Sequence, residues 1–270
     1  MVGEKKTEGL KEVRGTREWA VAEINCSHGC PHGCKYCYAR YDMVQRRRLL
    51  SQEEWSLGKT VVEDVLRRHP LYSGQVMFPT AHDIVPANLA ACMTVLGNLL
   101  SAGNKVLVVS KPHLECIRAL CAKFVDMRDR LLFRFTITAR NPEILATWEP
   151  WAPGYEERKS CLEFAFREGF ATSVSVEPML DTKDVVAMVY ELLPFVSHSI
   201  WLGKMNKIKE RVVIDSAAIR LAVEMLENGQ EDIEILKIYQ KLSGIPQVRW
   251  KDSVKQVVGL APAEKPGLDI

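Results

Sequence analysis

The chain has 270 residues, of which 47% are hydrophobic and 26% are charged, and its formal net charge at pH 7 is +2. These are ordinary values for a globular protein with a large core, and they show no overall basic bias that would demand a nucleic-acid partner. No run of about 18 uncharged apolar residues occurs, and residues 1–11 are charged and lack an apolar signal segment. We therefore expect a soluble cytoplasmic protein without a membrane span.

Short strand-like apolar runs alternate with longer helical ones, which predicts parallel βαβ units. The predicted strands cover residues 20–25, 75–78, 105–109, 131–138, 171–176 and 198–202. The predicted helices cover residues 51–68, 86–101, a segment ending at 120, 142–148, 155–168 and 182–193. Six such repeats are too few to close an eight-stranded ring, so we expect an open barrel with its functional residues at the carboxyl ends of the strands.

The pattern changes after Gly203. Residues 214–228 and 231–242 are predicted to form two helices, and we expect the short mixed tail at 248–258 to pack on the barrel as a cap. The predicted organisation is an N-terminal leader over 1–19, a barrel over 20–206 and a helical C-terminal cap over 207–270.

The most informative feature is the spacing of Cys30, Cys34 and Cys37 in a CxxxCxxC pattern. Three thiolates on one short loop can hold three irons of a [4Fe–4S] cluster, because cysteine is the usual ligand of such clusters. The fourth iron then has no protein ligand and can bind a small molecule. The remaining cysteines, Cys26, Cys92, Cys116, Cys121 and Cys161, form no disulfide framework, which fits a reducing compartment.

This motif, with the aromatic Tyr36 before its last cysteine, resembles the signature of the radical S-adenosylmethionine (SAM) superfamily. The wider string from residue 24 to 40 resembles the branch of spore photoproduct lyase and the "DNA repair photolyase-like" proteins. The resemblance implies an α/β fold, a partial (β/α)6 barrel of the TIM type. It also implies a [4Fe–4S] cluster that cleaves SAM reductively to a 5′-deoxyadenosyl radical, which abstracts hydrogen from a substrate.

The resemblance also assigns roles to polar residues near the predicted strand ends. His82 and Asp83 are an acid–base pair or a contact for the SAM amino group, with ordinary loop hydrogen bonding as the alternative. The residues that it implies in binding SAM, besides Tyr36, are Lys111, Thr136, Thr138, Glu149, Arg158, Glu177 and Gly203. Each has a plain alternative, such as a surface lysine or a threonine chosen for its strand propensity.

One position departs from the lyase pattern. Thr80 stands where that family has the cysteine that returns a hydrogen atom to the product radical, and a threonine O–H bond is too strong for this task. Hydrogen return then needs another donor, such as Cys26, a tyrosine or regenerated 5′-deoxyadenosine. The substrate is unidentified, with nucleic acid preferred over a peptide or small molecule, and the expected electron donor is a flavodoxin or ferredoxin.

A different class of function is a non-enzymatic iron–sulfur or zinc-binding sensor or adaptor. Cys26, His28 and His32 lie among the motif cysteines, so this segment also supplies zinc ligands at short spacing. A zinc site of this kind usually takes two more ligands well downstream, and the chain has no downstream CxxC or HxxxH pair. The spacing therefore favours the cluster over zinc.

Overall fold

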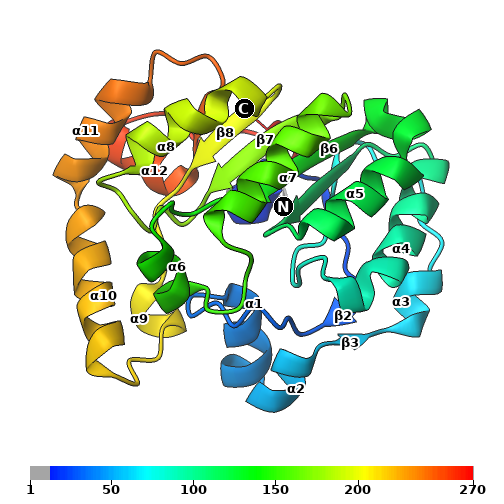
Figure 1. The fold of residues 1–270 in the computed structure, drawn as a ribbon, viewed down its shortest axis with the longest axis horizontal. Coiled ribbons are helices and arrows are strands. Elements are labelled where there is room, and N and C mark those ends of the chain that lie inside the picture. The colour runs from blue at the N-terminus through cyan, green and yellow to red at the C-terminus, as the bar shows by residue number, and fades with distance from the viewer. Residues whose placement is uncertain (1–12, 270) are drawn as a thin grey trace, which may run out of the picture.

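The computed structural model describes residues 13–269, and its centre is an open sheet of seven parallel strands (Figure 1). Their order in the sheet is β1 (Ala22–Glu23), β4 (Val76–Phe78), β5 (Val106–Ser110), β6 (Leu131–Thr136), β7 (Ala171–Val176), β8 (Ser199–Leu202) and β9 (Val248–Trp250). Within the described residues, β1 and β9 each pair with one strand only, so the ring stays open. The fold is the predicted α/β partial barrel.

Helices follow the strands and cover the outer face of the sheet. They are α4 (Leu89–Ser101), α5 (Leu114–Lys123), α6 (Pro142–Trp148), α7 (Tyr155–Arg167) and α8 (Val185–Leu192). Helices α5 and α7 pack on one another, and α7 contacts β6 and β7 (Figure 1). The main core lies between these helices and the sheet, because successive strands such as Val106–Ser110 are almost wholly buried and apolar.

The single helix predicted over 51–68 is wrong. The segment forms α2 (Gln52–Leu57), β3 (Lys59–Thr60) and α3 (Val62–Leu66), and β3 pairs antiparallel with β2 (Ser27–His28). Ser51 and Glu54 form a capping box that starts α2, whereas Gly58 ends it with a φ of +67°. A strand of two residues leaves no periodic signal, so the helical spacing of the apolar residues concealed the break.

The C-terminal part adds a strand to the sheet. After α9 (Ile208–Arg211), α10 (Ala217–Gly229) and α11 (Asp232–Leu242), strand β9 pairs parallel with β8 before α12 (Asp252–Val258). The two predicted helices are therefore present, but the tail is not only a cap, since Val248 to Trp250 extend the sheet beyond the range predicted for the barrel. Two apolar residues around one arginine are too short a pattern to predict a strand.

The first described residues pack against the sheet near β8. Residues 15–18 form a 3-10 turn, and Trp19 packs edge-on against Trp201 from β8, with 5.7 Å between the ring centroids. Near the other end of the chain, Gly267 N donates to Arg17 O, and Asp269 binds the fully buried Arg134 of β6 with an N–O distance of 2.8 Å. Of the predicted leader, residues 1–12 lie outside the described part, while residues 15–19 contact the barrel and the C-terminal segment.

A buried lysine joins this turn to the C-terminal segment. Lys251, which follows β9, has its Nζ 2.8 Å from Glu18 Oε1, donates to Gly15 O and lies 4.1 Å from the centre of the Trp19 ring. Lys251 and Glu18 are 0% and 1% exposed, so each charge depends on the other for compensation.

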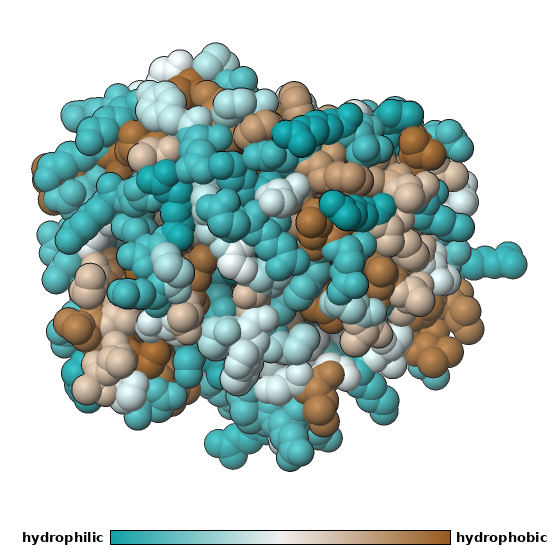
Figure 2. All heavy atoms as spheres, viewed as in Figure 1, coloured by the Kyte–Doolittle hydropathy of each residue, from teal (hydrophilic) through white to brown (hydrophobic). Residues whose placement is uncertain are grey.

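Hydrophobic residues on the visible face lie scattered among hydrophilic ones (Figure 2). Over residues 13–269, none of the helices is both long and apolar enough for a bilayer.

The buried Lys251–Glu18 pair makes a stability prediction. We expect Lys251→Met to lower the free energy of unfolding by about 3–5 kcal/mol, because it leaves the Glu18 carboxylate buried without a cation. The double variant Lys251→Met with Glu18→Gln should lose less, since both charges are gone. Urea denaturation followed by circular dichroism measures both. The control is Lys237→Met, whose exposed ion pair with Glu234 should contribute less than about 1 kcal/mol; equal losses in Lys251→Met and the control would contradict the prediction.

Candidate functional site

The three motif cysteines lie on the loop between β2 and α1 (Tyr38–Arg40), at the carboxyl end of the parallel strands. The backbone of this loop is tied down on two sides, because Cys30 N donates to Trp55 O and Lys35 N donates to Trp148 O. Cys37 caps α1, since its sulfur accepts a hydrogen bond from Arg40 N. The loop is therefore held by its surroundings and not by the cysteines alone.

Two glycines allow this loop to turn. Gly29 and Gly33 have φ values of +91° and +65°, which favour glycine. A Cβ on Gly33 would come within 2.4 Å of the Trp151 ring, and a Cβ on Gly29 would meet Trp55 O at 2.3 Å. Trp151, which was not among the predicted site residues, thus covers the loop on its outer side.

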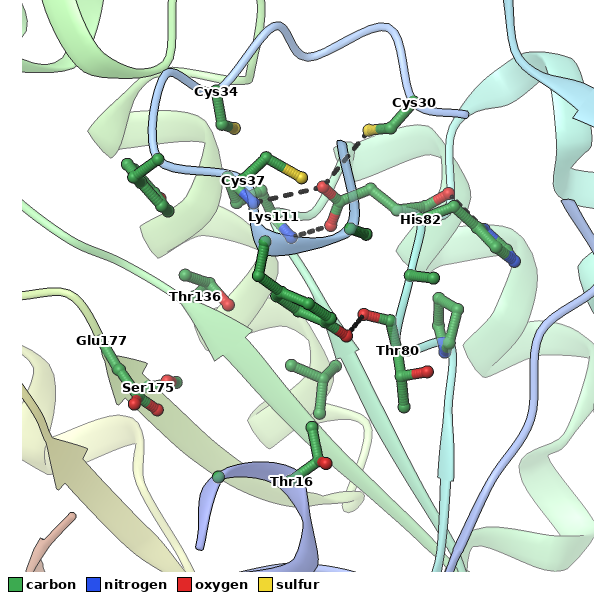
Figure 3. A pocket seen from close by; sticks show the side chains of 18 of the residues that line it. Thr16, Cys30, Cys34, Cys37, Thr80, His82, Lys111, Thr136, Ser175 and Glu177 are labelled. Carbon is green, nitrogen blue, oxygen red and sulfur yellow. Dashed lines mark hydrogen bonds and ion pairs between the residues drawn. The ribbon is translucent and has the colours of Figure 1, made fainter. Parts of the chain in front are cut away.

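A cavity of about 460 Å³ lies between the cysteine loop and the strand ends. Cys30, Cys34 and Cys37 all line it, and Figure 3 shows their sulfur atoms at one end, with Ser175 and Glu177 toward the other. The predicted residues that also line it are Tyr36, His82, Asp83, Lys111, Thr136 and Glu177. The structure thus brings most of the predicted site together around one space.

Asp83 is the most heavily bonded residue of the cavity. Its Oδ1 accepts from Ser110 Oγ at 2.9 Å and from Lys111 N at 2.7 Å, and its Oδ2 lies 2.9 Å from His32 Nδ1 and 3.2 Å from Lys111 Nζ. Burial alone would raise its pKa, but the Lys111 ammonium and the His32 ring hold the pKa of Asp83 well below its usual range. These contacts join the end of β5 and the cysteine loop to one carboxylate, so Asp83 anchors the loop.

His82 is likewise engaged by the protein. Its Nε2 accepts a hydrogen bond from Cys26 N at 3.2 Å, and its Nδ1 is 3.1 Å from Asp83 O. Nε2 is therefore the unprotonated nitrogen, and the proton lies on Nδ1 toward the carbonyl. His82 and Asp83 thus make the loop hydrogen bonds that the sequence left open as the alternative, and both also line the cavity.

Four predicted SAM contacts form a network at the wall. Arg158 Nη2 lies 2.5 Å from Glu149 Oε2 and both side chains are fully buried, while Glu149 also accepts from Thr138 Oγ1 at 3.0 Å and from the Tyr36 hydroxyl. Burial opposes ionisation, yet the Arg158 guanidinium holds the pKa of Glu149 below its usual value. In the described part of the chain, Thr138, Glu149 and Arg158 do not line the cavity; they support Tyr36, which does.

Glu177 and Gly203 lie at the other end of the site. Glu177 lines the cavity with its Oε2 3.8 Å from Lys251 Nζ, and burial raises the pKa of Glu177. A Cβ on Gly203 would come within 2.9 Å of the side chains of both Glu177 and Lys251. The close approach that Gly203 permits is therefore to these two side chains.

His32 and His113 were missing from the predicted site. His32 is 1% exposed, and its Nε2 lies 2.9 Å from Nε2 of the half-buried His113, which follows β5. The ligand atoms of Cys30, His32 and Asp83 all lie within 4.8 Å of one another. The sequence pointed to His32 only as a possible zinc ligand among the motif cysteines, and it gave no signal for His113.

The donor set of the cavity fits an iron–sulfur cluster. Three thiols from one loop line the cavity, and no further cysteine in the described part of the chain does so. Burial raises the pKa of Cys30 to about 12 and that of Cys34 well above its usual value, with Lys111 acting in the opposite direction. Metal binding at these thiols therefore releases protons, and the Lys111 ammonium offsets part of the negative charge that results.

The anchoring role of Asp83 can be tested on metal-free protein. We expect Asp83→Asn to speed the reaction of Cys30 with a thiol reagent by about tenfold or more, because charged hydrogen bonds worth about 1.5–3 kcal/mol are lost and the carboxylate no longer raises the Cys30 pKa. Alkylation followed by mass spectrometry gives the rate at this residue. Asp42→Asn, which removes a surface pair with Arg46, is the control and should leave the rate unchanged; equal rates in both variants would disprove the role.

No family model matches the chain, and no curated protein matches its sequence. The chain is similar to solved structures. A mutant of spore photoproduct lyase with dinucleoside spore photoproduct has a TM-score of 0.58 at 12% identity, over 90% of this chain and 79% of that one. Streptococcus suis SuiB bound to S-adenosylmethionine has a TM-score of 0.53 at 8% identity, over 92% of this chain and 54% of that one. The likeness to these structures shows the fold, and the chain shares their α/β partial barrel.

Proposed function

We propose that the chain is a radical SAM enzyme in which Cys30, Cys34 and Cys37 hold a [4Fe–4S] cluster. The observation that carries the proposal is the position of these thiols, which line one cavity at the carboxyl ends of the strands with no fourth cysteine among the described lining residues. The cluster and SAM together supply the chemistry, which is reductive cleavage to a 5′-deoxyadenosyl radical that takes hydrogen from the substrate.

The protein contributes binding groups of suitable charge. Lys111 brings a buried ammonium to the cysteine end of the cavity, where it suits a carboxylate, and the Thr136 hydroxyl offers a hydrogen bond. Glu177 presents a carboxylate at the other end, where it suits ribose hydroxyls. Tyr36 forms part of the wall and is held by the Glu149–Arg158–Thr138 network.

The substrate proposal prefers nucleic acid over a peptide or a small molecule. It is supported by the likeness to spore photoproduct lyase, which has been solved with a dinucleoside spore photoproduct, whereas SuiB has been solved with its precursor peptide SuiA. Thr80 lines the cavity, and its hydroxyl accepts a hydrogen bond from Asn25 Nδ2 at 2.7 Å, so it is a fixed polar group there. Among the donors considered for hydrogen return, Tyr38 lines the cavity, whereas Cys26 is buried behind His82. We further propose a flavodoxin or ferredoxin as the electron donor in the cytoplasm.

The central test is product formation. After anaerobic reconstitution with iron and sulfide, we expect addition of dithionite and SAM to release 5′-deoxyadenosine, which liquid chromatography with mass detection quantifies. Cys34→Ala should abolish the release, because two thiols cannot hold the cluster in place. The matched control is Cys121→Ala, a buried helix cysteine far from the motif in sequence, which should retain it. A cluster-replete protein that yields no 5′-deoxyadenosine would refute the proposal.

The role of Glu177 gives a separate prediction. We expect Glu177→Gln to raise the Kd for SAM about tenfold in the reconstituted protein, because a charge-assisted hydrogen bond to a sugar hydroxyl contributes about 1.4 kcal/mol more than a neutral one. Isothermal titration calorimetry measures the Kd. The exposed Glu156→Gln on α7 is the control, and a Kd unchanged in Glu177→Gln would assign Glu177 to packing with Lys251.

One observation favours a second candidate, a metal-binding sensor. Cys30, His32 and Asp83 could together hold a single ion such as zinc. Against it, Asp83 already pairs with the Lys111 ammonium, which a bound cation would repel. Metal analysis separates the candidates, since iron with inorganic sulfide supports the enzyme and one zinc per chain supports the sensor.

A further inference from the structure

Two buried thiols lie face to face behind the cavity. Cys26 Sγ is 3.8 Å from Cys92 Sγ, and both residues are 0% exposed. Cys26 follows β1 and leads into the cysteine loop, whereas Cys92 lies in the first turn of α4. The proposed function uses neither thiol, and 66 residues separate them in sequence.

A base and an activated sulfur accompany this pair. His82 Nε2, the unprotonated nitrogen, lies 3.9 Å from Cys26 Sγ. The hydrogen bond from Cys92 lowers the pKa of Cys26 to about 5 against the opposing effect of burial, while the same contact raises the pKa of Cys92. The lower pKa makes Cys26 the nucleophile of the pair, and Cys92, whose Sγ also lies 3.5 Å from Asn88 Oδ1, is the second thiol that closes the disulfide.

We propose that Cys26 and Cys92 are a redox-active dithiol that closes to a disulfide when it meets a small disulfide oxidant. The Cys26 thiolate attacks one sulfur of R–S–S–R and expels the first R–S⁻. The first R–S⁻ takes the proton of Cys92, and the Cys92 thiolate attacks Cys26 Sγ and expels the second R–S⁻. Two electrons pass from the cysteines to the oxidant, whose S–S bond is cut. The first R–S⁻ leaves as R–SH with the proton of Cys92, and the second takes from solvent the proton that Cys26 released when it ionised.

Closure has a consequence for the cavity. The two sulfur atoms must approach to about 2.0 Å, so the Cys26 side chain must move relative to His82. His82 lines the cavity and packs edge-on against Phe78, with 6.0 Å between ring centroids. The disulfide also links α4 to Cys26, the residue that precedes the cysteine loop. Oxidation of the pair therefore changes the position of the start of this loop without oxidising the motif cysteines.

The test uses protein that cannot bind a cluster, so its outcome is independent of the proposed function. The full-length variant C30A/C34A/C37A, with folding checked by circular dichroism, is treated with 2-hydroxyethyl disulfide, then denatured and alkylated. We expect two fewer alkylated cysteines than in untreated protein, and a tryptic species that joins the Cys26 and Cys92 peptides.

Matched variants identify the pair. Cys92→Ser in the same background should leave Cys26 with a persistent mixed disulfide, whereas Cys116→Ser, another buried helix cysteine, should leave closure intact. Should the triple variant fail to fold, metal-free wild-type protein is treated in the same way and the linkage is located by peptide fragmentation. Either full alkylation of folded protein or a stable mixed disulfide with Cys92 present would overturn the proposal.

Discussion

A single buried carboxylate holds the cavity together. Asp83 lies just beyond β4, yet its two oxygens bind the end of β5 through Ser110 and Lys111 and the cysteine loop through His32. Because the strands of an open barrel lack the closure of a full ring, their carboxyl ends need such cross-connections to stay in register at the mouth. The Lys111 ammonium compensates the charge, so the same pair also leaves a cation beside the thiols.

Two further ion pairs repeat this arrangement at other points of the wall. Glu149 and Arg158 join the end of α6 to α7 beside Tyr36, and Lys251 joins the C-terminal segment to the turn at 15–18. Each pair connects segments that the sheet does not connect. Buried pairs of this kind contribute little net stability compared with apolar packing, but breaking one is costly, so they specify one arrangement of the wall.

The sequence predicted the parts of the molecule that follow from periodicity and spacing. The first six strands of the sheet are where the sequence placed them, because buried parallel strands are nearly continuous apolar runs. The motif cysteines lie together at the strand ends, because the spacing of ligands along a short loop can be read directly from the sequence. It missed β9, which is too short for a pattern, and joined α2 to α3, since only residues 58–61 separate the two helices. The partners of Asp83 could not be predicted, because His32 and Asp83 meet only after the sheet has formed.

The glycine at position 33 has a consequence for the environment of the thiols. Trp151 is 68% exposed, yet its ring lies so close to Gly33 that no side chain fits between them. The indole thus has one face in solvent and the other against the backbone of the cysteine loop. Any larger residue at this position would displace the ring, so the contact between Trp151 and the loop depends on a hydrogen atom at residue 33.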